Sequence, residues 1–135
     1  MNRSAMREVA FKFLYGAEIQ KELDKTQIDE FFANNDLDDE NAKKYLIDIT
    51  DGILNHEQEI TKLIEQNLKA DWQIERVSKV SLALLKLAIF EIKYQNLPYK
   101  AIINEVVELS KKYGEDNAHQ FVNGVLASIV NEDLL

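Results

Sequence analysis

The sequence predicts an all-α protein. Among its 135 residues there are only one proline and four glycines, the two residue types that least tolerate the interior of a helix. Apolar residues recur at intervals of three and four along most of the chain, which is the spacing of an amphipathic helix. A chain of this length forms one domain, or two small subdomains that share a core.

The N-terminal segment predicts two helices. An apolar stripe predicts the first helix over residues 4–20, with Ser4 as its N-cap. Thr26 and Asp29 then form a pattern similar to a capping box, in front of a short helix that continues through Phe32. Both helices are expected to bury one apolar face against the rest of the protein.

The middle of the chain predicts one long helix and a linking segment. A loop rich in Asn and Asp precedes a helix over about residues 39–68, within which Gly52 is expected to mark a bend. Residues 69–73 form a link, and we expect Trp72 to pack at the seam between the two halves of the protein. A short helical turn over residues 74–78 follows.

The C-terminal segment predicts three helices. Residues 79–95 are apolar on most sides, which is typical of a helix that is buried all round. Pro98 opens the next helix, because its missing N–H group falls where a helix offers no partner, and Gly114 is expected to end it in the left-handed conformation. Asn117 is the expected N-cap of the last helix, and Gln120 completes a capping-box pattern.

Three polar residues stand out within the last two helices. Asn104 and Glu105 lie in the first of these helices and Asn123 lies in the second. We expect their side chains to tie the two helices together by buried hydrogen bonds, because an unpaired polar group in such a place costs about 1–3 kcal/mol. This interpretation gives the three residues a structural role.

Catalytic and metal-binding chemistry has little support in the sequence. The chain has no cysteine, and its two histidines, His56 and His119, lie far apart. It lacks a glycine-rich phosphate loop, a zinc-binding spacing and a nucleophile elbow. We therefore expect a protein that is not an enzyme and that uses no metal or cofactor. No apolar run reaches the roughly 20 residues of a membrane span and no signal peptide is recognisable, so we expect a cytoplasmic protein.

The net charge of −8 argues against a nucleic-acid partner, but its distribution weakens that objection. Residues 22–59 hold twelve acidic and three basic residues, whereas the residues before them hold four basic and two acidic ones. Arg3 and Arg7 are expected on one face of the first helix. Lys12 follows, and the ring of Tyr15 offers a stacking face for a base. Taken alone, such residues are more often ordinary surface.

Four sequence motifs resemble those of the transcription antitermination factor NusB family. Residues 7–15 resemble the family's R-E-x-A…L-Y opening, and residues 85–92 resemble its L-R-x-A-x-Y-E-L helix. Residues 98–105 are similar to its P-x-x-V-A-I-N-E segment, and residues 121–126 match its F-V-N-G-V-L motif without change. The order and the spacing agree over nearly the whole chain, so the sequence is identified as a member of this family.

The resemblance implies a fold and a function. It implies an all-α fold of about seven helices, with an N-terminal helical subdomain over about residues 1–70 and a C-terminal one over about residues 71–135. It also implies a protein that binds the boxA element of nascent RNA together with NusE, a ribosomal protein of the small subunit. The pair helps RNA polymerase to read through termination signals, chiefly in ribosomal RNA operons, without a catalytic step.

The resemblance further implies two binding surfaces. The RNA surface is expected to combine side chains from the first helix with side chains at the start of the last helix, namely Arg3, Arg7, Lys12, Tyr15, Asn117, Gln120 and Phe121. The surface for NusE is expected around the buried helix over residues 79–95 and the segment that leads into it, namely at Glu75, Ser81, Leu84 and Leu85.

This chain departs from the family pattern that the resemblance implies. Its N-terminus has fewer arginines than is usual, so we expect weak RNA affinity and a shallow salt dependence for the isolated protein, with an affinity that rises when NusE binds. Ser81 stands where relatives often carry an acid, Gln120 where they often carry a basic residue, and Asn117 where an Asp is frequent. A neutral residue in place of that Asp removes a charge that would repel phosphate.

Two alternative functions stay open from the sequence. One is the NusB-like RNA-binding domain of a ribosomal RNA cytosine methyltransferase, and the other is a helical adaptor that binds only proteins. The chain ends about where the domain of such a methyltransferase ends, which favours the free-standing factor. The sequence also leaves open whether the protein is a monomer or a homodimer.

Overall fold

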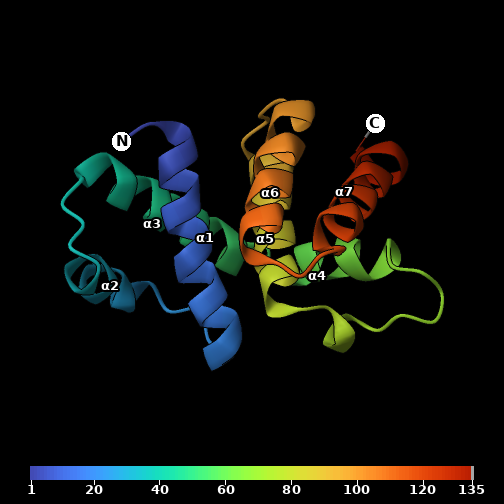
Figure 1. The fold of residues 1–135 in the computed structure, drawn as a ribbon, viewed down its shortest axis with the longest axis horizontal. Helices are drawn as coiled ribbons and strands as arrows, with labels where there is room; N and C mark the ends of the chain where they lie inside the picture. Colours follow the sequence, from blue (N-terminus) through green and yellow to red (C-terminus); the bar gives the residue numbers. More distant parts are fainter. Residues whose placement is uncertain (135) are drawn as a thin grey trace.

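The computed structural model describes residues 1–134, which form helices and connecting segments with no β-strand (Figure 1). The predicted all-α fold of about seven helices is confirmed. The helices are α1 (Arg3–Gln20), α2 (Ile28–Asn34), α3 (Glu40–Asn55), α4 (Glu57–Gln66), α5 (Lys79–Ile89), α6 (Tyr99–Tyr113) and α7 (Ala118–Ile129). Shorter turns are η1 (Lys25–Gln27) and η2 (Ile74–Arg76), which are 3-10 helical, and η3 (Phe90–Tyr94) and η4 (Val130–Leu134), which are π-helical.

Helix α5 is the centre of the core. It packs against α1, α3 and α4 from the first half of the chain and against α6 and α7 from the second half. Figure 1 shows α1 and α7 on opposite sides of α5 and α6. Every residue from Ser81 to Ile89 is buried except Lys86, as the apolar pattern predicts. One core thus joins both halves, and a division into subdomains near residue 70 stays a prediction.

The N-terminal helices begin at different residues from those predicted. Asn2 caps α1, because its Oδ1 accepts a hydrogen bond from the N–H of Ala5 at 2.8 Å. Ser4 lies inside the helix instead. Asp24, rather than Thr26, supplies the next cap, with its Oδ1 accepting from the N–H of Thr26 at 2.9 Å, and it starts the 3-10 turn η1. No side chain caps α2.

The predicted helix over residues 39–68 is two helices. Helix α3 ends before His56 and α4 begins after it. The imidazole ring of His56 stacks on the ring of Tyr94, with centroids 3.8 Å apart. Gly52 is not the bend, because it lies within α3. A Cβ atom at Gly52 would lie 1.8 Å from a ring carbon of Phe90, so the glycine lets that ring pack directly on the helix backbone.

The corner between α6 and α7 forms as predicted, but its end residues act differently. Pro98 precedes the first residue of α6. Gly114 has an extended backbone, with φ −93° and ψ 176°, and not the predicted left-handed one. A Cβ atom at Gly114 would lie 2.8 Å from the carbonyl oxygen of Ser110, so close packing explains the glycine. Asn117 forms no side-chain cap on α7, so the predicted capping box with Gln120 is absent.

Trp72 packs against the second half of the chain but stays largely exposed. Its side chain is 45% exposed, and its ring packs against Phe121 of α7. No helix within residues 1–134 is long and apolar enough to cross a membrane.

Candidate nucleic-acid interface

Arg7 lies in a buried ion cluster. It is 3% exposed, and its Nε and Nη2 donate to the two carboxylate oxygens of Glu91 at 2.6 and 3.1 Å. Its Nη1 donates to Oε1 of Glu105 at 2.8 Å, and the hydroxyl of Ser4 donates to the same oxygen. Burial lowers the pKa of Arg7, but hydrogen bonding to Glu91 and the charge of that carboxylate outweigh this effect and raise the pKa above its usual value.

The structure contradicts the prediction that Arg7 contacts RNA phosphate. Its guanidinium group is directed at Glu91 and Glu105 and has almost no contact with solvent. A bidentate pair of this kind is strong and geometrically specific. The cluster joins α1 to α6 and to the π-helical turn that follows α5, so Arg7 belongs to the core of the fold.

The polar residues of α6 and α7 do not form the predicted buried network. Glu105 accepts hydrogen bonds from Arg7 and Ser4. Asn104 and Asn123, in contrast, are exposed, and neither side chain makes a hydrogen bond within the part of the chain that the structure describes. The prediction is wrong for these two asparagines, because both point away from the contact between the helices.

Arg3 and Lys12 are the basic residues of α1 that stay exposed. The guanidinium carbon of Arg3 lies 5.1 Å from the ring centroid of Tyr45, and Nζ of Lys12 lies 5.9 Å from that of Tyr113. Neither cation forms an ion pair with a carboxylate in residues 1–134. Tyr15 is half-buried, and its ring stacks on Phe11. The first helix therefore presents two exposed cations that form no ion pair within residues 1–134.

Lys112 adds a third cation, which lies beside Lys12. Its Nζ lies 5.4 Å from the ring centroid of Tyr113 and donates to Oε2 of Glu8 at 2.6 Å. The hydrogen bonds from Lys112 and then from Tyr113 hold the pKa of Glu8 below its usual value. Lys112 and Lys12 both lie beside the ring of Tyr113 because α6 packs on α1. The two lysines are 100 residues apart in the sequence, so no local sequence pattern could have predicted that they are neighbours.

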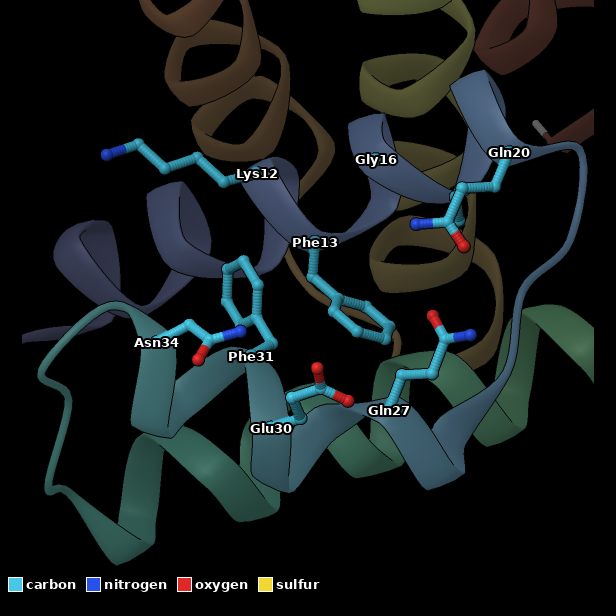
Figure 2. A pocket seen from close by; sticks show the side chains of 9 residues that line it. Lys12, Phe13, Gly16, Gln20, Gln27, Glu30, Phe31 and Asn34 are labelled. Atoms are coloured by element: carbon cyan, nitrogen blue, oxygen red, sulfur yellow. The ribbon is translucent and has the colours of Figure 1, made fainter.

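A surface pocket of about 330 Å³ lies between α1 and α2 (Figure 2). The rings of Phe13 and Phe31 meet edge to face there at 5.3 Å. Figure 2 shows Gln20 and Glu30 beside these rings, and Lys12 pointing away from them at the edge of the pocket. The lining holds no histidine or hydroxyl nucleophile. Within residues 1–134, no group of three or more His, Asp or Glu side chains is placed to hold a metal ion.

The start of α7 presents the second part of the predicted RNA surface. Asn117 and Gln120 are exposed, and Phe121 is half-buried. The ring of Phe121 lies 5.8 Å from that of Trp72, centroid to centroid, at an angle of 32°. The sequence prediction placed Trp72 at the seam between the two halves and did not include it in the RNA surface.

The residues predicted to contact NusE divide into exposed and buried ones. Glu75 is exposed in η2. Ser81 is 2% exposed, and its N–H donates to Oγ of Ser78, which caps α5. Leu84 and Leu85 are fully buried in the centre of the core, so the structure contradicts a direct contact of these two leucines with a partner. Their place on a helix that is apolar on most sides explains the difference.

Comparisons with known proteins agree with this architecture. The model of the NusB family matches residues 4–131. The transcription antitermination protein NusB of Acetivibrio thermocellus is 39% identical, over 100% of this chain and 92% of that protein. The protein of the same name from Clostridium novyi is 39% identical, over 96% of this chain and 98% of that protein.

Solved structures give the same result. T. maritima NusB superposes with a TM-score of 0.86 at 31% identity, covering 98% of this chain and 92% of that chain. A crystal structure of the antitermination factors NusB and NusE in complex with double-stranded RNA superposes with a TM-score of 0.84 at 28% identity, covering 96% of both chains. With the family model matching nearly the whole sequence, the chain belongs to the NusB family.

Proposed function

We propose that this protein is a transcription antitermination factor that binds RNA together with a NusE-type ribosomal protein. Its relatives from A. thermocellus and C. novyi carry the name of transcription antitermination protein. The observation that carries the proposal is the likeness of the whole chain to a NusB that was solved together with NusE and RNA. Antitermination is a binding function, and it requires no catalytic group.

The family resemblance suggests the more specific task. The RNA is the boxA element of a nascent transcript, chiefly from ribosomal RNA operons, and the complex acts on RNA polymerase in the cytoplasm. The alternative functions, an adaptor that binds only proteins or a domain of a methyltransferase, are outcomes of the test below.

The proposed RNA surface lies on α1, the end of α6 and the start of α7. Arg3 and Lys12 supply exposed cations that form no ion pair within residues 1–134, and Lys112 adds a cation that is shared with Glu8. Tyr15 and, on α7, the residues Asn117, Gln120 and Phe121 supply stacking and hydrogen-bonding groups. Arg7 is excluded, because its donors are used within the core.

The proposed contact with NusE is smaller than the sequence implied. Glu75 presents a carboxylate on η2, and Ser81 lies at the wall of a neighbouring surface hollow. Because Leu84 and Leu85 are buried, they act on this contact only by holding α5 in place.

A titration of labelled boxA RNA tests the proposal. We expect weak binding by the protein alone and tighter binding when purified NusE is added. In the Arg3→Glu, Lys12→Glu double variant, two phosphate contacts are lost, so the slope of log affinity against log salt should become shallower by about 1.4 for a single-stranded RNA. Lys62→Glu is the matched control, since Lys62 is exposed on α4 and lies outside the proposed surface.

Two results would contradict the proposal. RNA binding that is unchanged in the double variant would favour the adaptor that binds only proteins. Turnover of RNA with a methyl donor would favour the methyltransferase domain.

A further inference from the structure

Trp72 is an exposed aromatic residue with no role in the core. Its side chain is 45% exposed, and it packs on Phe121, which lies on the proposed RNA surface. We propose that Trp72 and Phe121 form one stacking platform for an unpaired RNA base, and that Gly124 is a glycine because the base occupies the space in front of it. This inference rests on the proposed function and adds a residue and a binding hollow to it.

The aromatic pair separates two surface hollows. The first hollow has a volume of about 460 Å³ and is lined by residues of the α4–α5 link and of α7, namely Asn67, Leu68, Lys69, Trp72, Asn117, Gln120, Phe121, Gly124 and Val125. The second has a volume of about 700 Å³ and shares Trp72, Asn117 and Phe121 with the first. Both volumes lie within the range of small-molecule sites, about 300–1,000 Å³, so each can hold a base.

Gly124 keeps one wall of the first hollow open. It lies inside α7, where glycine destabilises a helix relative to alanine. A Cβ atom at Gly124 would meet no atom within 4 Å, so neither packing nor backbone conformation requires the glycine. Gly16 in α1 is equally unobstructed, whereas at Gly52 a ring of the protein itself occupies the space. A ligand that approaches the α7 backbone closely would explain Gly124.

The polar groups of the first hollow suit a nucleotide. Lys69 is its cation, and among residues 1–134 no carboxylate lines it, although Asp133 accepts a hydrogen bond from Asn67 at its edge. The side-chain amides of Asn117 and Gln120 make no hydrogen bond within residues 1–134, so their donors and acceptors are free for the edge of a base. Asn67 is already occupied, because it donates to Leu63 and Asp133 and accepts from Ser128.

The second hollow suits an RNA strand less well. It contains Glu115 and Asp116 as well as one cation, Arg76, and two carboxylates repel phosphate. We therefore assign the base to the first hollow. The base must be unpaired, because a base within a duplex is stacked on its neighbours and has no free face to offer to an aromatic side chain.

The single tryptophan of the chain allows a direct test. Its fluorescence reports on Trp72 alone, so a titration with a single-stranded boxA oligoribonucleotide should quench it, and the same strand annealed into a full duplex should not. Trp72→Ala should weaken binding of the single strand about 5- to 150-fold, which is the fold-change that corresponds to the stacking of one base at 25 °C.

Gly124→Leu fills the first hollow from within and should weaken the binding of the single strand without lowering the thermal midpoint. Its matched control is Asn123→Leu, because Asn123 is the neighbouring exposed residue of the same helix and does not line the hollow. The control should bind RNA as the wild type does.

The outcomes separate this inference from the function on which it rests. If the wild type binds no RNA with or without NusE, the proposed function fails. If the wild type binds RNA without a change in Trp72 fluorescence, and Trp72→Ala and Gly124→Leu bind RNA as the wild type does, only the stacking platform is refuted. Equal quenching by the duplex refutes the assignment to an unpaired base. If Trp72→Ala weakens NusE binding in the absence of RNA and leaves RNA binding unchanged, the hollow is a protein-docking site, which also overturns the inference.

Discussion

Arg7→Met removes the cation that two carboxylates share. In the wild type, Glu91 is 0% exposed and Arg7 is its bidentate partner, with the shorter contact at 2.6 Å. Methionine fills a similar volume but brings no charge, so the Glu91 carboxylate would stay in the core without a counter-ion. The side chain of Glu105 is 35% exposed and can turn to water, so most of the cost arises at Glu91.

The expected loss of stability follows from this burial. Breaking a buried ion pair by removing one partner costs about 3–5 kcal/mol, which is a large part of the 5–15 kcal/mol by which proteins are usually stable. At about 2.1 cal/mol/K per residue, unfolding of a chain of this length has an entropy of about 0.28 kcal/mol/K. The thermal midpoint should therefore fall by about 10–18 °C.

Circular dichroism at 222 nm during heating, together with urea unfolding, measures this loss. The Arg7→Met, Glu91→Gln double variant is the informative control, because it removes the buried charge along with its partner and should recover much of the lost stability. A midpoint that falls by only a few degrees, together with a selective loss of RNA affinity, would refute the structural role of Arg7 and would restore it as an RNA contact.

Two further changes test the packing and the electrostatics. Gly52→Ala places a methyl group against the ring of Phe90, so we expect a loss of about 1–3 kcal/mol in urea unfolding, and an unchanged midpoint would show that the ring moves aside freely. The pKa of Glu8 is lowered, first of all by the hydrogen bond that Glu8 accepts from Lys112. The stabilisation that Glu8 gives is therefore complete above its ordinary pKa of 4.5. It is lost as the pH falls through the lower pKa of the folded state. Glu8→Gln should therefore melt below the wild type at pH 7, and the two midpoints should converge below pH 4.5; a gap that is constant with pH would contradict the ion pair.

The helices were largely predictable because their signals are local. Apolar spacing located the helical segments, although it merged α3 and α4 into one helix, since a residue three or four positions away lies on the same face whatever the rest of the chain does. The caps were less predictable. Asn2 and Ser4 are both good N-cap residues. Asn2 is the cap, whereas the hydroxyl of Ser4 donates a hydrogen bond to Glu105, 101 residues further along the chain.

The candidate site was predictable only in part, for a similar reason. Arg3 and Arg7 lie one helical turn apart and have the same chemistry, so the sequence treats them alike. Arg7 is separated from Glu91 by 84 residues and from Glu105 by 98, and only the packing of three segments shows that it is neutralised. Trp72 was expected at the seam between the two halves, and its exposure depends on where the α4–α5 link runs.

The sequence by itself determined the fold class, the approximate helices and the family, because each depends on residue types at short spacings or in short motifs. The tertiary structure alone decided which polar side chains face the core and which face solvent. It placed Arg7 inside and Asn104 and Asn123 outside, and it set Trp72 beside Phe121. The physical reason is that burial and charge pairing depend on segments that are distant in the sequence and come together only in the fold. Two residues one turn apart on the same helix, such as Arg3 and Arg7, can therefore differ, with one exposed to water and the other paired in the core.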